Sequence, residues 1–263
     1  MNKKVHVIDF HWENFIPKMY CYSDKIEEFS LCNLDLKISR EMRCVGKFKN
    51  GNYIPCPNKE KVSEYIQCSN CAELFIGELS CIFEPKCNGE RCIPKFCQNP
   101  HAVYLAFFNE LPKVGMTYAK RIRERVIEQG ADAFSIIKIV GNRKEARDLE
   151  KKISKVLRIP QSQNNENILR RLCFNVNKKG IEYKFKILKK GLTKKFEIEK
   201  MNLIFLEDYP ISQPLRSKPR LRKTEGLHKG KVIGIKGKFL IYDANGLNAL
   251  KLPEVPGRYI HFL

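Results

Sequence analysis

The sequence lacks the long apolar runs that mark helical membrane proteins. No uninterrupted apolar stretch reaches the roughly 20 residues that a membrane-spanning helix needs. The N-terminal stretch MNKKVHVIDFHWENF also lacks the continuous apolar core of a secretory signal peptide. Neither an internal repeat nor a low-complexity tail is present. We therefore expect a globular cytoplasmic protein without a membrane partner.

Acidic residues are scarce relative to basic ones. The chain has 29 Asp and Glu against 49 Lys and Arg, which gives a net charge of +20. This excess attracts polyanions, of which nucleic acid is the usual one. The alternative is a lysine-rich surface whose charges are only solvated. We expect RNA or DNA to be the partner, with these contact residues: Arg121, Arg123, Arg216, Lys218, Arg220, Arg222 and Lys223.

Cysteines are abundant and clustered. Their number, eleven, is odd and does not suggest a closed set of disulfides. Cys68-x2-Cys71 lets two thiolates reach one metal ion at about 2.3 Å from each sulfur. An iron–sulfur cluster is the weaker alternative, because the spacings match no ferredoxin pattern. We predict one structural zinc held by Cys68, Cys71 and two of Cys81, Cys87, Cys92 and Cys97. The remaining cysteines, Cys21, Cys32, Cys44, Cys56 and Cys173, are expected to be core thiols.

The residue pattern divides the chain into four segments. Residues 1–66 alternate apolar and polar side chains, and Asn50-Gly51 suits a tight hairpin turn. Residues 67–100 form a Cys-rich zinc knuckle with too few large aliphatic residues for a core of their own. Residues 101–175 read as strand, strand, helix, strand, helix, helix. Residues 176–263 read as a β-rich segment with a basic loop. The prediction is an α+β fold whose N- and C-terminal β-rich segments pack together.

The stretch VYLAFFNELPKVGMT, residues 103–117, predicts two short strands joined by a tight connection. A helix follows to Gln129 and ends at Gly130, and the next helix begins at Asn142 with Glu145 as its capping-box partner. Glu150 lies in one helical row with apolar residues. An acid in that position is more often solvated or paired than catalytic.

These residues, taken in order, resemble the core of the GIY-YIG nucleases, a family that includes an excision-repair endonuclease and several homing and restriction enzymes. The resemblance implies a three-stranded sheet with helices. It places Tyr104 on the tyrosine of the first motif and Gly115 on the glycine of the second. It also implies that Arg125 steadies the scissile phosphate and that Glu150 binds Mg²⁺ or Mn²⁺.

Lys113 departs from this family's pattern, because it stands where the nucleases have their second tyrosine. A phenol at that position helps to position or activate the attacking water, which a charged ammonium does not do. An ammonium can instead hold a phosphate. The departure favours binding over ordinary nuclease turnover.

The chain more closely resembles an uncharacterised family of bacterial and archaeal proteins that carry a GIY-YIG-like core behind a cysteine cluster. The similar motifs occur in order at residues 96–101, 103–106, 113–117, 127–131, 233–237 and 247–248. Two function classes stay open. The first is a nucleic-acid-binding zinc protein without nuclease turnover. The second is an enzyme, either a metal-dependent phosphodiesterase or an RNA-processing or RNA-modifying factor that uses the same pocket.

Overall fold

The computed structural model describes residues 4–72, 81, 84–90, 96–198 and 200–263. The chain has an α+β fold and divides into two compact units. Unit 1 comprises Met1–Glu73, Tyr209–Ser212 and Arg216–Leu263, and unit 2 comprises Leu74–Asp208 and Gln213–Leu215. Unit 1 is therefore built from both ends of the chain, while unit 2 is almost one continuous segment.

Unit 1 is built on a ten-stranded sheet, in which nine strands follow the order β12-β15-β14-β13-β4-β16-β1-β2-β3 and β7 pairs with β4. A separate hairpin of β5 and β6 lies in the same unit. The N-terminal strands are β1 (Lys4–Glu13), β2 (Ile16–Tyr22), β3 (Ile26–Glu28), β4 (Asn33–Arg43), β5 (Lys47–Lys49), β6 (Asn52–Ile54) and β7 (Lys61–Val62). The C-terminal strands are β12 (Arg220–Leu221), β13 (Gly226–Lys236), β14 (Phe239–Asp243), β15 (Leu247–Lys251) and β16 (Arg258–Phe262).

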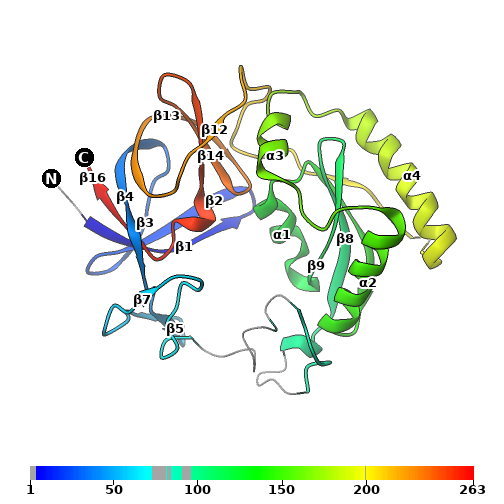
Figure 1. Cartoon of the computed structure of the whole chain (residues 1–263), viewed down its shortest axis with the longest axis horizontal. Coiled ribbons are helices and arrows are strands. Elements are labelled where there is room, and N and C mark those ends of the chain that lie inside the picture. The colour runs from blue at the N-terminus through cyan, green and yellow to red at the C-terminus, as the bar shows by residue number, and fades with distance from the viewer. Residues whose placement is uncertain (1–3, 73–80, 82–83, 91–95, 199) are drawn as a thin grey trace. The chain divides into compact units, whose positions relative to one another are not determined.

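The two ends of the chain share this sheet. β16 lies between β1 and β4 and is antiparallel to both, and β13 pairs with the other edge of β4 (Figure 1). Alternation along these strands directs one row of side chains into a common core, which includes Val7, Leu36 and Ile260. The two β-rich segments thus pack together as the alternating pattern predicts.

Unit 2 contains a four-stranded antiparallel sheet in the order β11-β10-β8-β9. β8 and β9 form a hairpin, and Tyr104 pairs directly with Gly115 across it. The sheet strands are β8 (His101–Phe108), β9 (Leu111–Tyr118), β10 (Ala133–Val140) and β11 (Ile204–Phe205). The helices are α1 (Ile122–Gln129), α2 (Arg143–Leu157), α3 (Asn165–Arg171) and α4 (Lys178–Phe196). The hairpin connection is only Asn109-Glu110, and β11 is a strand of two residues too short to show alternation in the sequence.

Local sequence signals determine where α1 and α2 begin and end. Gly130 closes α1 in a left-handed conformation with φ 78°, as its role as a C-terminal cap requires. The Asn142 side chain caps α2 by accepting a hydrogen bond from the Glu145 backbone N–H. α2 then packs Ala146 and Ile153 into the core of unit 2, together with Val103 and Leu105 of β8.

One predicted element is wrong. Residues 178–196, part of the segment expected to be β-rich, form the 19-residue helix α4. The stretch IEYKFKIL fits both periods. Its apolar residues recur at every second position from Ile181 to Ile187, as in a strand, and Ile181, Phe185 and Leu188 also have helical spacing. In the structure Ile181, Phe185, Leu188 and Leu192 are buried at helical spacing, whereas Tyr183 is 69% exposed. The cap at Asn177, whose side chain accepts from the Gly180 N–H, favours the helix.

None of the helices in the described ranges combines the length and the apolar character that crossing a membrane requires.

Candidate functional site

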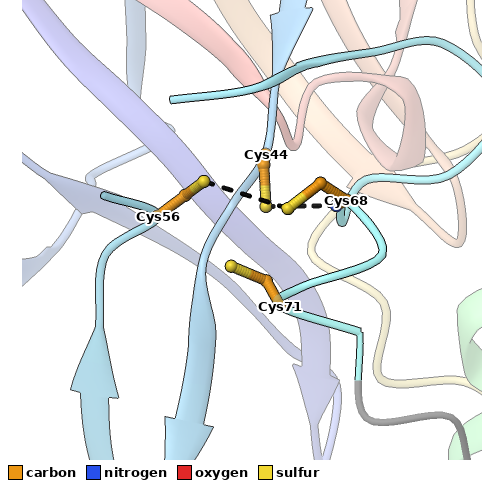
Figure 2. A group of neighbouring side chains, drawn as sticks. All are labelled: Cys44, Cys56, Cys68 and Cys71. Atoms are coloured by element: carbon orange, nitrogen blue, oxygen red, sulfur yellow. Dashed lines mark hydrogen bonds between the residues drawn. The ribbon is translucent and has the colours of Figure 1, made fainter. Parts of the chain in front are cut away.

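Four cysteines of unit 1 form one cluster, shown in Figure 2. Cys44 follows β4, Cys56 follows the β5–β6 hairpin, and Cys68 and Cys71 lie in the loop after β7. Their Sγ atoms all lie within 4.8 Å of one another, and the side chains point toward a common centre. The β5–β6 hairpin brings this about, because it returns the chain from Cys44 to Cys56.

The geometry of the cluster fits a tetrahedral metal ion. Four sulfurs at about 2.3 Å from one zinc lie about 3.8 Å from each other, and the Cys56 and Cys68 Sγ atoms are 4.0 Å apart. The Gly46 and Cys68 backbone N–H groups donate to Cys44 Sγ at 3.4 and 3.2 Å. Such donors stabilise a metal-bound thiolate. The donor set therefore matches a structural zinc site.

Burial opposes ionisation of these thiols when no cation is bound. It raises the pKa of the Cys44 and Cys71 thiols above the ordinary value. Burial acts in the same direction on Cys56. Hydrogen bonds with the Glu60 backbone, the Cys44 thiol, the Asn58 backbone and the Cys71 thiol together outweigh it and lower the pKa of the Cys56 thiol. Four ionised sulfurs at this distance repel one another, so a bound cation is what makes the thiolate form of the cluster favourable.

The predicted ligand set is corrected in two positions. Cys68 and Cys71 are brought together, but with Cys44 and Cys56, which the sequence pattern placed among the core thiols. Of the other expected ligands, Cys81, Cys87 and Cys97 belong to unit 2, and Cys92 lies outside the described residues. The sequence does contain a signal for the other two ligands. Asn50-Gly51 predicts a hairpin turn midway between Cys44 and Cys56, which brings these two cysteines together.

In unit 2, Tyr104 and Gly115 are packed against each other. A Cβ atom placed on Gly115 would lie 2.7 Å from Cζ and Oη of Tyr104, so only glycine fits beneath this ring. Tyr104 is 1% exposed, and its hydroxyl lies 3.3 and 3.1 Å from Oε1 and Nε2 of Gln129 in α1. Burial raises the pKa of the Tyr104 phenol, which keeps it protonated at neutral pH.

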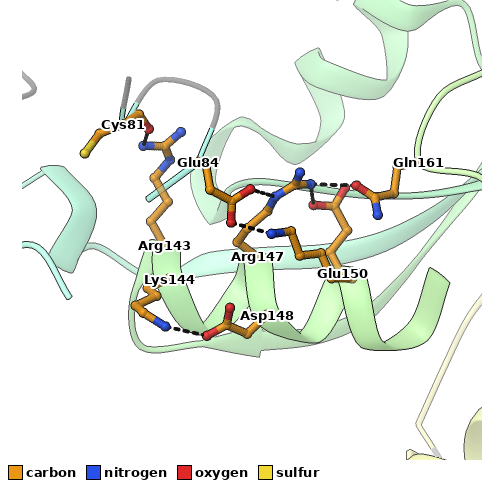
Figure 3. Close-up of polar contacts among 9 residues, drawn as sticks. Cys81, Glu84, Arg143, Lys144, Arg147, Asp148, Glu150 and Gln161 are labelled. Atoms are coloured by element: carbon orange, nitrogen blue, oxygen red, sulfur yellow. Dashed lines mark hydrogen bonds and ion pairs between the residues drawn. The ribbon is translucent and has the colours of Figure 1, made fainter. Parts of the chain in front are cut away.

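Glu150 of α2 is buried and paired. Its Oε2 atom accepts a hydrogen bond from Arg147 Nη1 at 2.6 Å (Figure 3). The same guanidinium binds Glu84 at 3.1 Å and Gln161 at 2.7 Å, which fixes it against the carboxylate. Burial raises the pKa of Glu150, while the charges of Arg147 and Lys113 act in the opposite direction.

The residues predicted as a catalytic group lie within electrostatic reach of one another. The charges of Arg125 and Glu150 both influence the Tyr104 phenol. The Lys113 ammonium lies 5.9 Å from the centroid of the Tyr104 ring, and its side chain is buried. The structure thus gathers Tyr104, Lys113, Arg125 and Glu150 around one hairpin, with two cationic groups and one carboxyl group. We call these four residues the hairpin site.

The hairpin site does not fit a divalent cation as it stands. Its single carboxylate, Glu150, already holds Arg147, and Lys113 adds a second positive charge nearby. Mg²⁺ and Mn²⁺ prefer several oxygen ligands and are repelled by fixed cations. Within the described part of the chain, the four cysteines are the only group of three or more side chains suited to one metal ion.

The other predicted nucleic-acid contacts are all exposed. Arg121 and Arg123 lie on the solvent side of η3 (Ala119–Arg121) and α1, although Arg121 forms ion pairs with Glu124 and Glu128. Arg216 pairs with Asp243. The exposed basic residues of the segment 216–223 are Arg216, Lys218, Arg220, Arg222 and Lys223.

The contacts of Gln129, Arg147, Glu84 and Gln161 with the site were not predicted from the sequence. The contact of Arg147 with Glu150 could be predicted from the sequence. Arg147 stands three residues before Glu150 on the same helix, and side chains at this spacing are neighbours on the helix surface. Glu84 lies 63 residues from Arg147 and Gln161 lies 14 residues away. No local pattern relates them, so only the fold reveals these two contacts.

Comparison with known proteins gives one match. No curated protein and no solved structure matches this chain. The sequence model of the family described as "Protein of unknown function (DUF2797)" matches residues 32–254. This span covers most of both units, and the chain belongs to that family.

Proposed function

We propose that this DUF2797 protein is a zinc-containing nucleic-acid-binding protein whose GIY-YIG-like core holds the phosphate backbone without ordinary nuclease turnover. The observation that carries the proposal is the pairing of Glu150 with Arg147 at 2.6 Å in the hairpin site. The carboxylate that a nuclease of this type needs for its metal is neutralised by a fixed guanidinium. The site is therefore suited to an anion.

The charge of the whole chain supports nucleic acid as that anion. A net charge of +20 is far above what solubility needs, and the basic residues 216–223 are exposed. Each phosphate that a Lys or Arg neutralises releases condensed counterions, which makes such binding strong at low salt. Lys113 and Arg125 are the cationic groups of the hairpin site, and Arg125 also pairs with Glu128 at 3.4 Å.

The order of elements in unit 2 supports the resemblance to the GIY-YIG core. Two paired strands, a helix, a third strand and a second long helix follow one another as β8, β9, α1, β10 and α2. Tyr104 pairs with Gly115 across the hairpin. Arg125 and Glu150 come from the two helices and both act on the Tyr104 phenol. A site of this geometry can hold a phosphate whether or not it cleaves.

Zinc has a structural role in this proposal. Cys44, Cys56, Cys68 and Cys71 would hold it as thiolates, and the ion would supply a cross-link among three separate stretches of unit 1. All four ligand positions are then filled by protein, as in structural zinc sites. Catalytic zinc sites keep one position open.

A metal-dependent phosphodiesterase is the second candidate, and the convergence of Tyr104, Arg125 and Glu150 favours it. It requires Arg147 to release Glu150 when substrate binds. If the protein is instead an RNA-processing or RNA-modifying enzyme that uses the same pocket, its chemistry involves Lys113 rather than a metal ion on Glu150.

Recovery of bound nucleic acid from the native protein tests the proposal. Sequencing of the recovered material distinguishes RNA from DNA. Binding that weakens steeply with salt, and that falls when the five basic residues of 216–223 are replaced together by glutamine, is the expected result. Glutamine substitution of five exposed lysines far from residues 216–223 in the sequence, Lys25, Lys37, Lys49, Lys138 and Lys155, is the matched control for charge. Absence of binding at low ionic strength would reject the proposal and leave the charge as surface solvation.

A further inference from the structure

Helix α4 of unit 2 carries a basic face that neither the cysteine cluster nor the hairpin site uses (Figure 1). The helix has eight lysines and one acidic residue, Glu182, among its 19 residues. One face packs into the core of unit 2 with Ile181, Phe185, Leu188 and Leu192. The opposite face is exposed, and we call it the lysine face. It consists of Lys179, Tyr183, Lys186, Ile187, Lys190 and Lys194.

The charges of the lysine face are not balanced within the described residues. Lys186, Lys190 and Lys194 follow one another at intervals of four residues, a spacing at which like charges are neighbours and destabilise a helix. No described carboxylate forms an ion pair with the four lysines of this face, whereas Lys178, outside it, pairs with Glu207 at 2.7 Å. A surface that is only solvated usually mixes both signs. This face is therefore suited to a polyanion, which relieves the repulsion.

Two apolar side chains stand among these lysines. Tyr183 is 69% exposed, and Ile187, one turn further along, is 49% exposed. An exposed aromatic ring beside cationic groups offers a stacking surface to an unpaired base, while the cations hold its phosphates. A helix that binds a membrane surface instead inserts a broad apolar face into the lipid. The broad apolar face of α4 is already buried in the core of unit 2, so nucleic acid suits the exposed face better than lipid does.

The composition of α4 favours contacts with the backbone of a nucleic acid over recognition of its sequence. Arg, Asn and Gln, whose flat polar groups form paired hydrogen bonds with base edges, do not occur in this helix. Lysine acts on phosphate as a point charge. From Lys179 to Lys194 the face is about 22 Å long at a rise of about 1.5 Å per residue, which is enough for several nucleotides. A duplex keeps its bases stacked inside and offers none to Tyr183.

We propose that the lysine face of α4 binds a single-stranded nucleic acid without sequence preference. Its four lysines contact phosphates of the strand, and the Tyr183 ring stacks on one unpaired base, with Ile187 packed beside that base. This inference rests on the proposed function, since it names the kind of strand and a contact surface separate from residues 216–223 and from the hairpin site.

The salt dependence of binding by the full-length protein tests the lysines. Fluorescence anisotropy measures the affinity for a labelled single strand of about 12 nucleotides at several salt concentrations. Replacement of all four lysines by glutamine should make the slope of log affinity against log salt about 3 less negative, because each phosphate contact in a single strand contributes about 0.7. The control removes the same charge outside α4, by glutamine at four exposed lysines: Lys25, Lys37, Lys138 and Lys155. It should change the slope by less than about 1.

Two substitutions at one position test the stacking. Tyr183→Leu removes the ring from an exposed helix position and should weaken binding of the single strand about tenfold. Binding of an abasic strand of the same length, and of a duplex, should not change, because neither presents an unpaired base. Tyr183→Phe keeps the ring and should retain the wild-type affinity. Thermal unfolding verifies that all variants are folded.

The outcomes separate this inference from the proposed function. A wild-type protein that binds neither strand nor duplex at low salt overturns both. Binding that falls when residues 216–223 are replaced, but has the same salt slope in the α4 variant and the control, overturns the lysine face alone. Equal loss of single and abasic strands in Tyr183→Leu, or no loss, overturns the single-strand assignment. Vesicles of phosphatidylserine and phosphatidylcholine in equal amounts test the other polyanion. Vesicle binding that the α4 variant loses while it keeps nucleic-acid binding would overturn the inference in favour of a membrane surface.

Discussion

The cysteine cluster of unit 1 and the hairpin site of unit 2 both gather ionisable side chains from distant parts of the sequence, but their charge balance is opposite. In the cluster four thiols meet, and each thiol that ionises adds a negative charge. In the hairpin site the one carboxylate, Glu150, meets Arg147 and lies near Lys113. The first arrangement is suited to a cation, and for the second we propose an anion.

This difference shows that proximity of ligand-type residues does not by itself indicate a metal. Glu150 occupies the position that the resemblance assigns to a metal ligand, yet its partner is an arginine fixed by Glu84 and Gln161. Around the cysteine sulfurs, the described residues supply backbone N–H donors and the other thiols as neighbours at hydrogen-bond distance. The balance of charge at each place is the reason why we propose zinc for the first and phosphate for the second.

Removal of one zinc ligand should have the largest effect. Cys68→Ser should abolish zinc binding and lower the free energy of unfolding by several kcal/mol. That is less than the roughly 10–16 kcal/mol of isolated zinc-finger peptides, because the ten-stranded sheet supports unit 1 independently. Elemental analysis and urea unfolding measure both quantities. Cys32→Ser, at an exposed cysteine outside the cluster, is the control. A Cys68→Ser protein with full zinc content would contradict the assignment.

Arg147→Ala should come next. It leaves Glu150 buried without its contact partner, at a cost of about 2–3 kcal/mol, below the 3–5 kcal/mol of a fully buried pair because Arg147 is partly exposed. Lys144→Ala breaks an exposed ion pair with Asp148 on the same helix and should cost less than about 0.5 kcal/mol. Equal effects of the two substitutions in urea unfolding would show that Glu150 is not held as described.

Glu150→Gln should have the smallest effect, and one that depends on pH. Burial raises the folded-state pKa of Glu150 above its ordinary value, so the folded protein holds this proton more tightly than the unfolded chain. Its contribution to stability is present below about pH 4 and is lost as the pH rises through the folded pKa. The stability of Glu150→Gln relative to wild type should therefore increase between about pH 4 and pH 7. Urea unfolding across this range measures the change.

Asp148→Asn, which removes an exposed carboxylate from the same helix, is the control for the pH series. A relative stability of Glu150→Gln that falls with rising pH would mean that Arg147 outweighs burial at this carboxylate.

The elements with local signals were predictable from the sequence. The capping box at Asn142 and Glu145 and the glycine cap at Gly130 mark the beginning of α2 and the end of α1. The pattern of residues 103–117 also predicts the β8–β9 hairpin, whereas the register that pairs Tyr104 with Gly115 comes from the structure. Helix α4 was missed because IEYKFKIL fits the strand period as well as the helical one, and burial against the core of unit 2 decides between them.

The ligand set of the cysteine cluster and the neutralisation of Glu150 were not predictable to the same degree. Cys44 and Cys56 become ligands only because a hairpin folds back between them. Arg147 is near Glu150 in the sequence, but its fixed orientation depends on Glu84, which is remote along the chain. Contacts between residues far apart in the sequence leave no periodic signal, so the charge balance of a site emerges only from the fold.

The most direct test of the central claim is the fate of bound nucleic acid. Native protein is incubated with its recovered nucleic acid, or with a labelled single strand, in Mg²⁺ or Mn²⁺, and the length and end chemistry of the product are determined. The account predicts intact nucleic acid and salt-sensitive binding that Glu150→Gln leaves unchanged or slightly strengthens, because a negative charge near the phosphates is gone. Metal-dependent cleavage by the wild-type chain that Glu150→Gln eliminates would contradict it.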